Sequence, residues 1–257
     1  MTRRTFLASA LSATGLLLTV SACATLGLEH PPTARQPLPT VQKSPSGKPS
    51  TPANVPVLTE DQAHAALITD TDLGAPWTPT RGAAAWRDGM LKATTPTADC
   101  QKLLDGLYTD ELLGGPARAV VALDDPDSEA QLRYQLGGLR PAEADRVLAW
   151  LRALPEKCAR FTATAPDGTV LDVSVGELRL PEVGDARQGL RVTLTDWSAD
   201  GDPVSLDLDV AAVRAGQDTF ALTNGSLNDV PNEATQAAVQ LGVRRLTEVR
   251  KQGRAQV

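Results

Sequence analysis

The chain has 257 residues, a formal net charge of −6 at pH 7 and a calculated pI near 5.0. Residues 57–257 hold 20 of the 25 basic residues and 30 of the 31 acidic ones, so this part carries a net charge near −10. A surface with that balance repels nucleic acid and anionic lipid headgroups. The composition therefore argues against a nucleic-acid partner.

The first 22 residues have the pattern of a secretory signal peptide. Arg3 and Arg4 precede an apolar run from Phe6 to Val20. A run of about 15 residues is shorter than the roughly 20 that a helix needs to span a membrane. The basic start, the short apolar run and the small residues after it predict an export signal over residues 1–22. The stretch TRRTFL also resembles a twin-arginine signal, but paired arginines occur in ordinary signals too, so the export route stays open.

The signal ends in VSAC, residues 20–23, which resembles the bacterial lipobox. This resemblance implies cleavage between Ala22 and Cys23 and a diacylglyceryl thioether on Cys23, with further acylation of the new N-terminus by a chain such as palmitate. Two or more acyl chains attach a protein stably to a membrane. The alternative is an uncleaved N-terminal anchor with an incidental cysteine. We expect a lipoprotein on the extracytoplasmic face of the cell membrane.

The next segment, residues 23–56, is expected to be a disordered tether. Residues 29–56 contain eight prolines, many serines and threonines, and no aromatic residue. Such a composition buries too little apolar surface to fold. The remaining residues, 57–257, are long enough for one domain with a substantial core.

In the first half of this domain, the sequence predicts two helices followed by two strands. Thr97 is a suitable N-cap for the second helix, in which Leu103, Leu104 and Leu107 share one face. The second strand alternates apolar and polar residues, a pattern typical of a half-buried strand. The predicted helices are 60–67 and 98–108, and the predicted strands are 117–123 and 130–136.

In the second half, a helix begins at Pro141, a favoured first helical position, and continues to about Leu154. Strands separated by turn residues follow, and Asn224–Gly225 predicts another turn. A last helix begins near Asn232. The element order indicates an α+β fold with a largely antiparallel β-sheet flanked by helices. The later strands are expected at 169–178, 188–197, 204–213 and 217–223.

Apart from Cys23, the sequence holds two cysteines, Cys100 and Cys158. An even number of cysteines in an exported domain predicts a disulfide. It would close a loop of about 58 residues and stabilise the fold by about 4 kcal/mol in the chain-entropy model. The histidines, His30 and His64, lie elsewhere in the sequence, so we expect neither a metal site nor a cofactor.

Two stretches, TPTADCQKLLDGL and LRALPEKCARFTA, together with the strands up to FALTNGS, resemble the PknH-like extracellular sensor domain over roughly residues 60–250. That domain is the external part of a mycobacterial transmembrane kinase and recurs in actinobacterial lipoproteins. The resemblance implies an antiparallel sheet flanked by helices, with a cleft for an undetermined ligand. The kinase's domain has two disulfides, whereas this sequence can form one. The arginine-rich, lysine-poor composition agrees with an actinobacterial origin.

No motif for nucleophilic or zinc-dependent catalysis is found in the sequence. A G-x-S-x-G elbow and H-E-x-x-H spacing are missing, and His64 is more typical of a surface or packed histidine than of a catalytic base. We therefore predict a protein that is not an enzyme and has no catalytic residues. A carboxylate pair, as in a cell-envelope hydrolase, is the less favoured alternative.

Two acidic stretches could be calcium loops or solvated turns. Clustered carboxylates suit a hard cation, but the glycine and terminal glutamate of an EF-hand are missing. Turns are therefore the preferred interpretation. The acidic residues are Asp124, Asp125, Asp127 and Glu129 in the first stretch, and Asp196, Asp200 and Asp202 in the second.

The four tryptophans are candidates for contact with a ligand. Trp77 and Trp86 lie in the loop-like stretch APWTPTRGAAAWRDG and are the preferred ones, whereas Trp150 and Trp197 are expected to pack. The predicted function is a binding or sensor-like module with an unknown small-molecule or protein ligand in a cleft. A lipid or glycolipid carrier is the alternative, and it would need a large dry cavity.

Overall fold

The computed structural model describes residues 57–197 and 201–255. The predicted signal peptide, the cleavage site between Ala22 and Cys23, the lipidation of Cys23 and the tether lie outside these residues and stay predictions. Within the described part of the chain, no helix combines the length and the apolar character needed to cross a membrane.

Eight strands form one sheet in which every neighbouring pair is antiparallel. The order across the sheet is β1-β2-β3-β8-β7-β6-β5-β4, so the last strand in the sequence is inserted beside the third. The strands are β1 (Thr78–Pro79), β2 (Ala119–Asp125), β3 (Ala130–Gly137), β4 (Arg160–Thr164), β5 (Val170–Glu177), β6 (Ala186–Asp196), β7 (Val204–Ala215) and β8 (Asp218–Leu227).

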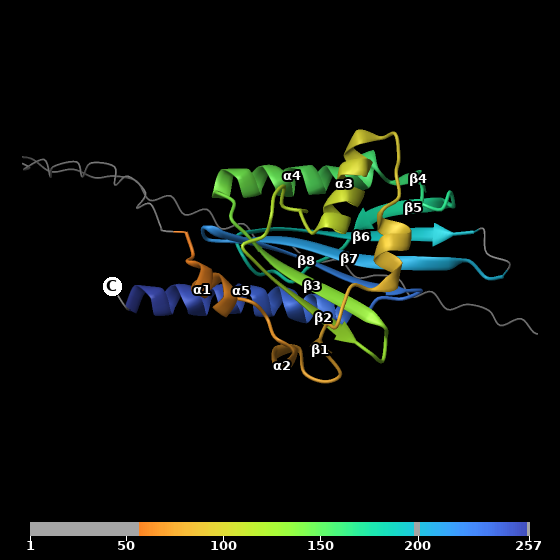
Figure 1. Ribbon diagram of the computed structural model, residues 1–257. Coiled ribbons are helices and arrows are strands. Elements are labelled where there is room, and N and C mark those ends of the chain that lie inside the picture. The colour runs from red at the N-terminus through yellow and green to blue at the C-terminus, as the bar shows by residue number, and fades with distance from the viewer. Residues whose placement is uncertain (1–56, 198–200, 256–257) are drawn as a thin grey trace, which may run out of the picture. The chain divides into compact units, whose positions relative to one another are not determined.

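Helices cover both sides of the sheet (Figure 1): α3 and α4 lie on one side, and α1 and α5 lie on the other. A short α2 lies against α5, and a single π-helical turn, η1, precedes α3. The helical elements are α1 (Glu60–Ala65), α2 (Asp70–Leu73), η1 (Arg87–Leu91), α3 (Ala98–Thr109), α4 (Pro141–Lys157) and α5 (Asn232–Ala255).

The two helical layers produce two cores, one on each side of the sheet. On the α4 side, Leu148, Leu151 and Leu154 are buried, as the apolar spacing of the helix predicts. On the α5 side, the rings of Tyr134 and Phe220 pack with their centroids 5.0 Å apart. Among the described residues, the members of both cores lie between positions 58 and 249.

Glycine is required where α5 crosses this aromatic pair. A Cβ atom at Gly242 would lie 2.8 Å from Cε2 of Tyr134 and 2.9 Å from Cζ of Phe220. Real Cβ atoms do not approach other atoms so closely, so Gly242 lets the helix axis come near the sheet. Any larger residue there would push α5 away from the sheet.

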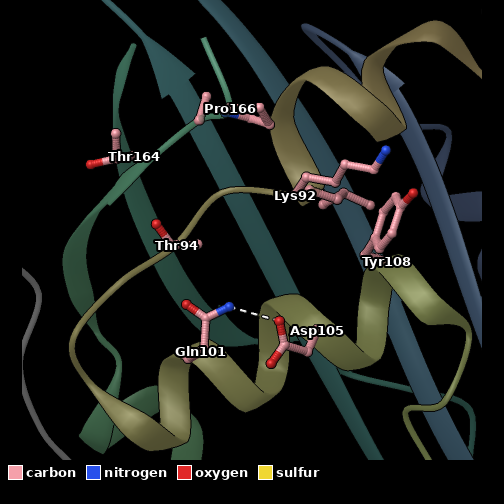
Figure 2. A pocket seen from close by; sticks show the side chains of 9 residues that line it. Lys92, Thr94, Gln101, Asp105, Tyr108, Thr164 and Pro166 are labelled. Carbon is pink, nitrogen blue, oxygen red and sulfur yellow. Dashed lines mark hydrogen bonds between the residues drawn. The ribbon is translucent and has the colours of Figure 1, made fainter. Parts of the chain in front are cut away.

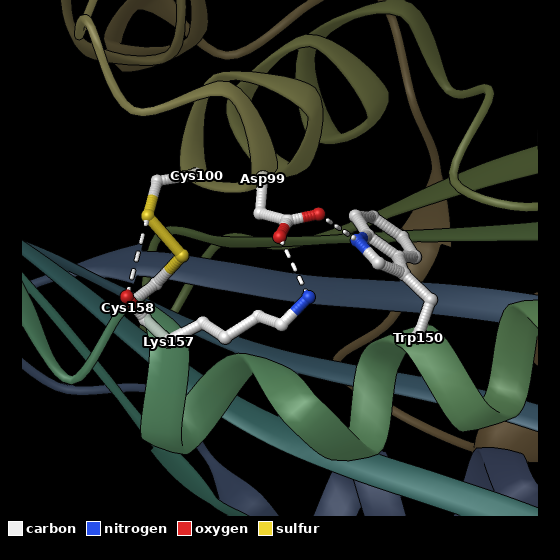
Figure 3. The surroundings of a disulfide bond; sticks show 5 residues. All are labelled: Asp99, Cys100, Trp150, Lys157 and Cys158. Carbon is white, nitrogen blue, oxygen red and sulfur yellow. Dashed lines mark hydrogen bonds and ion pairs between the residues drawn. A yellow bond between two sulfur atoms is a disulfide. The ribbon is translucent and has the colours of Figure 1, made fainter.

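The predicted fold class is confirmed: the domain is α+β, its sheet is antiparallel, and Cys100 and Cys158 form a disulfide with an S–S distance of 2.06 Å. The disulfide joins α3 to the end of α4 (Figure 3). Beside it, Asp99 accepts hydrogen bonds from Nζ of Lys157 at 2.8 Å and Nε1 of Trp150 at 3.2 Å. Covalent and polar links therefore fix the same two helices to each other.

Two local predictions are wrong. Asn224–Gly225 is not a turn but lies inside β8, where the two residues pair with Leu132 and Gln131 of β3. Gly225 is needed there because an added Cβ would lie 2.9 Å from Cη2 of Trp86. The half-buried pattern predicted for residues 130–136 also fails, because β3 is an inner strand with packing on both sides, and even Gln131 is buried.

Candidate ligand-binding site

A half-open cavity of about 1110 Å³ lies between α1, the second half of α5 and the turn that connects β7 to β8. We call it the α1–α5 cavity. Its walls come from segments that are far apart in the sequence and meet only in the folded domain. The lining residues that matter below are Val57, Asp185, Ala215, Gly216, Asp218, Val243, Leu246, Thr247, Arg250 and Arg254.

The floor of the cavity is apolar because α5 presents one face of its helical repeat there. Val243 and Leu246 are three residues apart, belong to the α5-side core or pack against it, and line the cavity together with Ala215. Val57 adds a valine side chain that is 58% exposed. Covering such surface with an apolar ligand releases about 25 cal/mol per Å² removed from water.

Carboxylates on the cavity wall already have partners within the protein. Asp218 of β8 accepts a hydrogen bond from Nε of Arg250 at 2.6 Å, and Oδ2 of Asp185 accepts one from the backbone N–H of Gly216 at 2.6 Å. Burial and the nearby charge of Asp218 raise the pKa of Tyr134, so its phenol stays neutral. These wall carboxylates are therefore satisfied, and burial against the apolar floor is the main gain that a ligand could make.

Arg254 also lines the cavity and, unlike Asp218 and Asp185, is a cation without an oppositely charged partner among the described residues. It is an exposed residue of the last turn of α5, and its Nε donates to the carbonyl of Arg250 at 3.3 Å. It has no ion pair with any residue that the structure describes. A ligand with an apolar body and an anionic end would match this arrangement.

A second hollow, the α3 groove, has about 420 Å³ and lies between α3 and the loop after β4 (Figure 2). Gln101 donates to Oδ1 of Asp105 at 2.7 Å. The ammonium group of Lys92 lies 5.0 Å from the ring centroid of Tyr108 and 3.3 Å from Oδ1 of Asp88. These side chains bind one another, so the groove is a weaker candidate for a ligand than the α1–α5 cavity.

No protein-family model and no curated protein matches the chain. Among solved structures, it is similar to the extracellular domain of PknH from Mycobacterium tuberculosis, with 17% sequence identity and a TM-score of 0.47. The alignment covers 75% of this chain and 98% of the other. This is the domain whose family the sequence resembles. A likeness this remote assigns no ligand.

The tryptophans are distributed differently from the sequence-based expectation. Trp77 is 8% exposed in the α5-side core, and Trp86 is 9% exposed in the α4-side core. Neither lines the α1–α5 cavity or the α3 groove, and ligand contact by them stays a prediction. Trp150 is partly buried, as expected, whereas Trp197 is 63% exposed. The alternation of a strand indicates a side of the sheet but does not show whether a helix covers it.

The first acidic stretch forms a hydrogen-bonded turn, as preferred from the sequence. Oδ1 of Asp125 accepts from the backbone N–H of Asp127 at 2.9 Å, and its Oδ2 accepts from the hydroxyl of Ser128 at 2.6 Å. Oδ1 of Asp124 accepts from Gln131 at 2.9 Å. The carboxylates therefore stabilise the hairpin.

The second acidic stretch and His64 add little to a candidate site. Asp200 lies outside the described residues. His64 is exposed on α1, with Nδ1 3.0 Å from the carbonyl of Glu60. Among residues 57–197 and 201–255, no three His, Cys, Asp or Glu side chains are arranged to hold a metal ion.

Sequence reasoning missed the α1–α5 cavity. Its lining residues occupy positions 57–62, 184–185, 215–218 and 243–254, and no motif connects these segments. One weak signal was available, because the apolar stripe of α5 continues through Val249 to the last turns of the helix. A stripe that long requires more covering surface than the sheet alone provides.

Proposed function

We propose that this protein is a lipid-anchored, extracytoplasmic binding module that holds a small amphipathic molecule in the α1–α5 cavity and does not catalyse a reaction. The observation that carries this proposal is the cavity itself, which combines an apolar floor, paired wall carboxylates and the exposed cation Arg254 in its lining. An actinobacterial lipoprotein with this role is the most specific form of the proposal.

The size of the cavity supports a small-molecule ligand. Sites for drug-sized ligands usually occupy about 300–1,000 Å³ and are mainly apolar, with a few polar groups that orient the ligand. At about 1110 Å³, the α1–α5 cavity is slightly larger than that range. A ligand of this size could be an acyl chain with a small headgroup.

The alternative of a lipid carrier is less favoured because the cavity is half-open. A carrier that transfers a whole lipid through water must enclose its chains, whereas the described residues enclose this cavity only in part. The absence of catalysis is supported by the state of the wall carboxylates. Asp218 and Asp185 both serve as acceptors for neighbouring groups, which restricts them as acids or bases.

The ligand can be tested by native mass spectrometry of residues 57–257, secreted from a related bacterium. We expect a mass excess that disappears on denaturation. Thr247→Trp places a large side chain at the cavity wall and should remove the excess. Glu248→Trp is the matched control, because Glu248 is exposed on the same helix and does not line the cavity, and it should keep the excess.

Two outcomes would contradict the binding site. The native protein could carry no excess mass and bind neither fatty acids nor lysophospholipids added to it. Alternatively, a bound molecule could remain in Thr247→Trp while the circular dichroism and the midpoint of thermal unfolding stay unchanged. The first result removes the small-molecule ligand, and the second places it elsewhere on the domain.

The anchor is tested separately on the full-length chain. Cys23→Ala should abolish the lipid modification, so the protein either leaves the membrane fraction or retains its signal peptide. Fractionation followed by intact mass measurement distinguishes these results from the wild type, whose N-terminus should be acylated Cys23. A wild-type protein with an unmodified cysteine and an intact N-terminal segment would refute the lipoprotein assignment.

A further inference from the structure

A third hollow, of about 380 Å³, lies on strands β4, β5 and β6. On β5, Asp172 and Ser174 alternate with Leu171, Val173 and Val175, which belong to the α4-side core, so they point to the α5 side of the sheet. The residues of β4 and β6 that pair with them point to the same side. We call this site the β4–β6 surface. It consists of Arg160, Thr162, Asp172, Ser174, Thr195 and Trp197.

The register of the strands aligns these polar groups in rows. Thr162 is opposite Asp172, and Asp172 is opposite Thr195, so a hydroxyl, a carboxylate and a second hydroxyl lie across three strands. Arg160 and Ser174 form the next row. Opposite side chains have Cβ atoms about 4.5–5.5 Å apart, so one row spans about 10 Å. This length is comparable to that of one or two sugar rings.

The polar side chains of this surface are not used within the fold. Among the described residues, those of Arg160, Thr162, Asp172, Ser174 and Thr195 make no hydrogen bond or ion pair. The neighbouring residues on the same side of the sheet behave differently. Arg191 pairs with Asp209, and Thr193 donates to Asp207 at 2.6 Å. The free groups are therefore available to an external partner without breaking any internal contact.

An exposed aromatic ring borders these groups. Trp197 is 63% exposed, although tryptophan is on average one of the more buried residue types. Continuing the pairing of Asp172 with Thr195 towards the end of β6 places Val170, which is 56% exposed, opposite Trp197. The surface thus combines one flat apolar platform with several free hydroxyl and charged groups.

We propose that the β4–β6 surface binds a neutral saccharide chain, at a site separate from the α1–α5 cavity. The C–H face of a pyranose ring would stack on the indole of Trp197. The hydroxyls of the sugar would donate to Asp172 and exchange hydrogen bonds with Thr162 and Thr195, while Arg160 donates to ring or hydroxyl oxygens. One carboxylate and one guanidinium balance each other here, which favours a neutral sugar over a polyanion.

Other macromolecular partners fit this surface less well. A stable protein interface buries about 800 Å² on each partner around a core depleted of charge. The exposed apolar side chains of this region, mainly Trp197 and Val170, are too few for such a core. Attachment to an anionic membrane would need a cluster of basic residues, and within the described part of the chain Arg160 is the single one that lines the hollow.

The test uses the full-length chain in lauryldimethylamine oxide, a detergent that contains no sugar. Cellohexaose, maltohexaose, chitohexaose and mannohexaose are titrated by isothermal calorimetry. At least one should bind with a Kd in the micromolar to millimolar range. Trp197→Ala and Asp172→Ala should each weaken that binding at least about tenfold. Val120→Ala, which removes a 41% exposed side chain from β2, is the matched control and should bind normally.

Thermal unfolding of each variant separates lost binding from lost folding. Thr247→Trp should retain the binding of the saccharide, which would show that the two sites are independent. The proposal is overturned if none of the four oligosaccharides binds. It is equally overturned if the Trp197 and Asp172 variants bind as tightly as the wild type. Binding of a protein from the cell envelope that depends on Trp197, with no affinity for the sugars, would replace the saccharide with a protein partner.

Discussion

The α5 side of the sheet has two regions that differ in whether their charged side chains have partners within the fold. Under α5, the buried carboxylate Asp218 binds Arg250. Asn224 donates to Thr235 at 3.1 Å, although its amide oxygen has no hydrogen-bond partner among the described residues. On β4 to β6, Arg160 and Asp172 have no partner within the described residues. Pairing accompanies burial, because an unpaired buried charge is costly, whereas an exposed group can remain free for a ligand.

Asp209 of β7 lies at the border between these two regions. It is fully buried, and its Oδ1 accepts from Nε of Arg191 at 2.8 Å. Its Oδ2 accepts from Asn232 at 2.8 Å and Thr235 at 3.0 Å, both in the first turn of α5. A carboxylate at a helix N-terminus also interacts favourably with the helix dipole. Asp209 therefore fixes the start of α5 to the sheet.

The largest expected effect is that of Asp209→Ala. Removing this carboxylate leaves Arg191, Asn232 and Thr235 without the acceptor that all three share. Because Asp209 is buried but Arg191 is 36% exposed, water can solvate the remaining guanidinium, and we expect a loss of about 2–3 kcal/mol. Urea unfolding followed by circular dichroism measures this loss directly.

Asp172→Ala is the matched control, since it removes a carboxylate from the same side of the sheet in the open region. Substitutions at exposed sites without partners usually change stability by less than about 0.5 kcal/mol. Equal losses of stability for Asp209→Ala and Asp172→Ala would contradict the proposed distinction between the covered and the open regions.

A smaller loss of stability is expected when the ion pair between Asp72 of α2 and Arg245 of α5 is removed. Burial raises the pKa of Asp72, but hydrogen bonds from Arg245 and Thr69 outweigh it and hold the pKa below its ordinary value. Asp72→Asn should lower the free energy of unfolding by about 1 kcal/mol at pH 7, because the pair is partly exposed.

The pH dependence of this loss has a defined sign. A carboxyl with a depressed pKa in the folded state stabilises the fold at pH values above its unfolded pKa, and this contribution is lost as the pH falls through the folded pKa. The difference between wild type and Asp72→Asn should therefore be largest near neutrality and shrink below about pH 4. A difference that stays constant from pH 7 to pH 3, measured by urea unfolding, would assign the effect to packing instead of charge.

Much of the fold could be predicted because its elements have clear periodicity. The apolar stripes of α3, α4 and α5 and the four strands β5 to β8 follow from local spacing, whereas the short strand β4 was not predicted. The disulfide followed from counting cysteines. The position of β8 between β3 and β7 could not be predicted from local spacing, because strand order depends on contacts between distant segments. For the same reason, local spacing did not show that β3 is covered on both sides.

The candidate sites were harder to predict than the fold. Asn224–Gly225 has the sequence of a turn, yet Gly225 provides space for Trp86 inside β8. The exposure of Trp197 depends on where α5 begins and how far it covers the sheet, which the alternation within β6 does not show. The cavity depends on four segments meeting. Each of these features is a property of tertiary packing, which overrides local propensity.

The insertion of β8 beside β3 has a consequence for the synthesis of the chain. During elongation, β3 has no partner on one of its edges until residue 227 has been made, about 90 residues after β3 itself is complete. An incomplete chain would present this edge as a template for pairing with other chains. The domain therefore closes only when nearly all of it is available, and premature truncation should yield aggregation-prone products instead of a smaller stable fold.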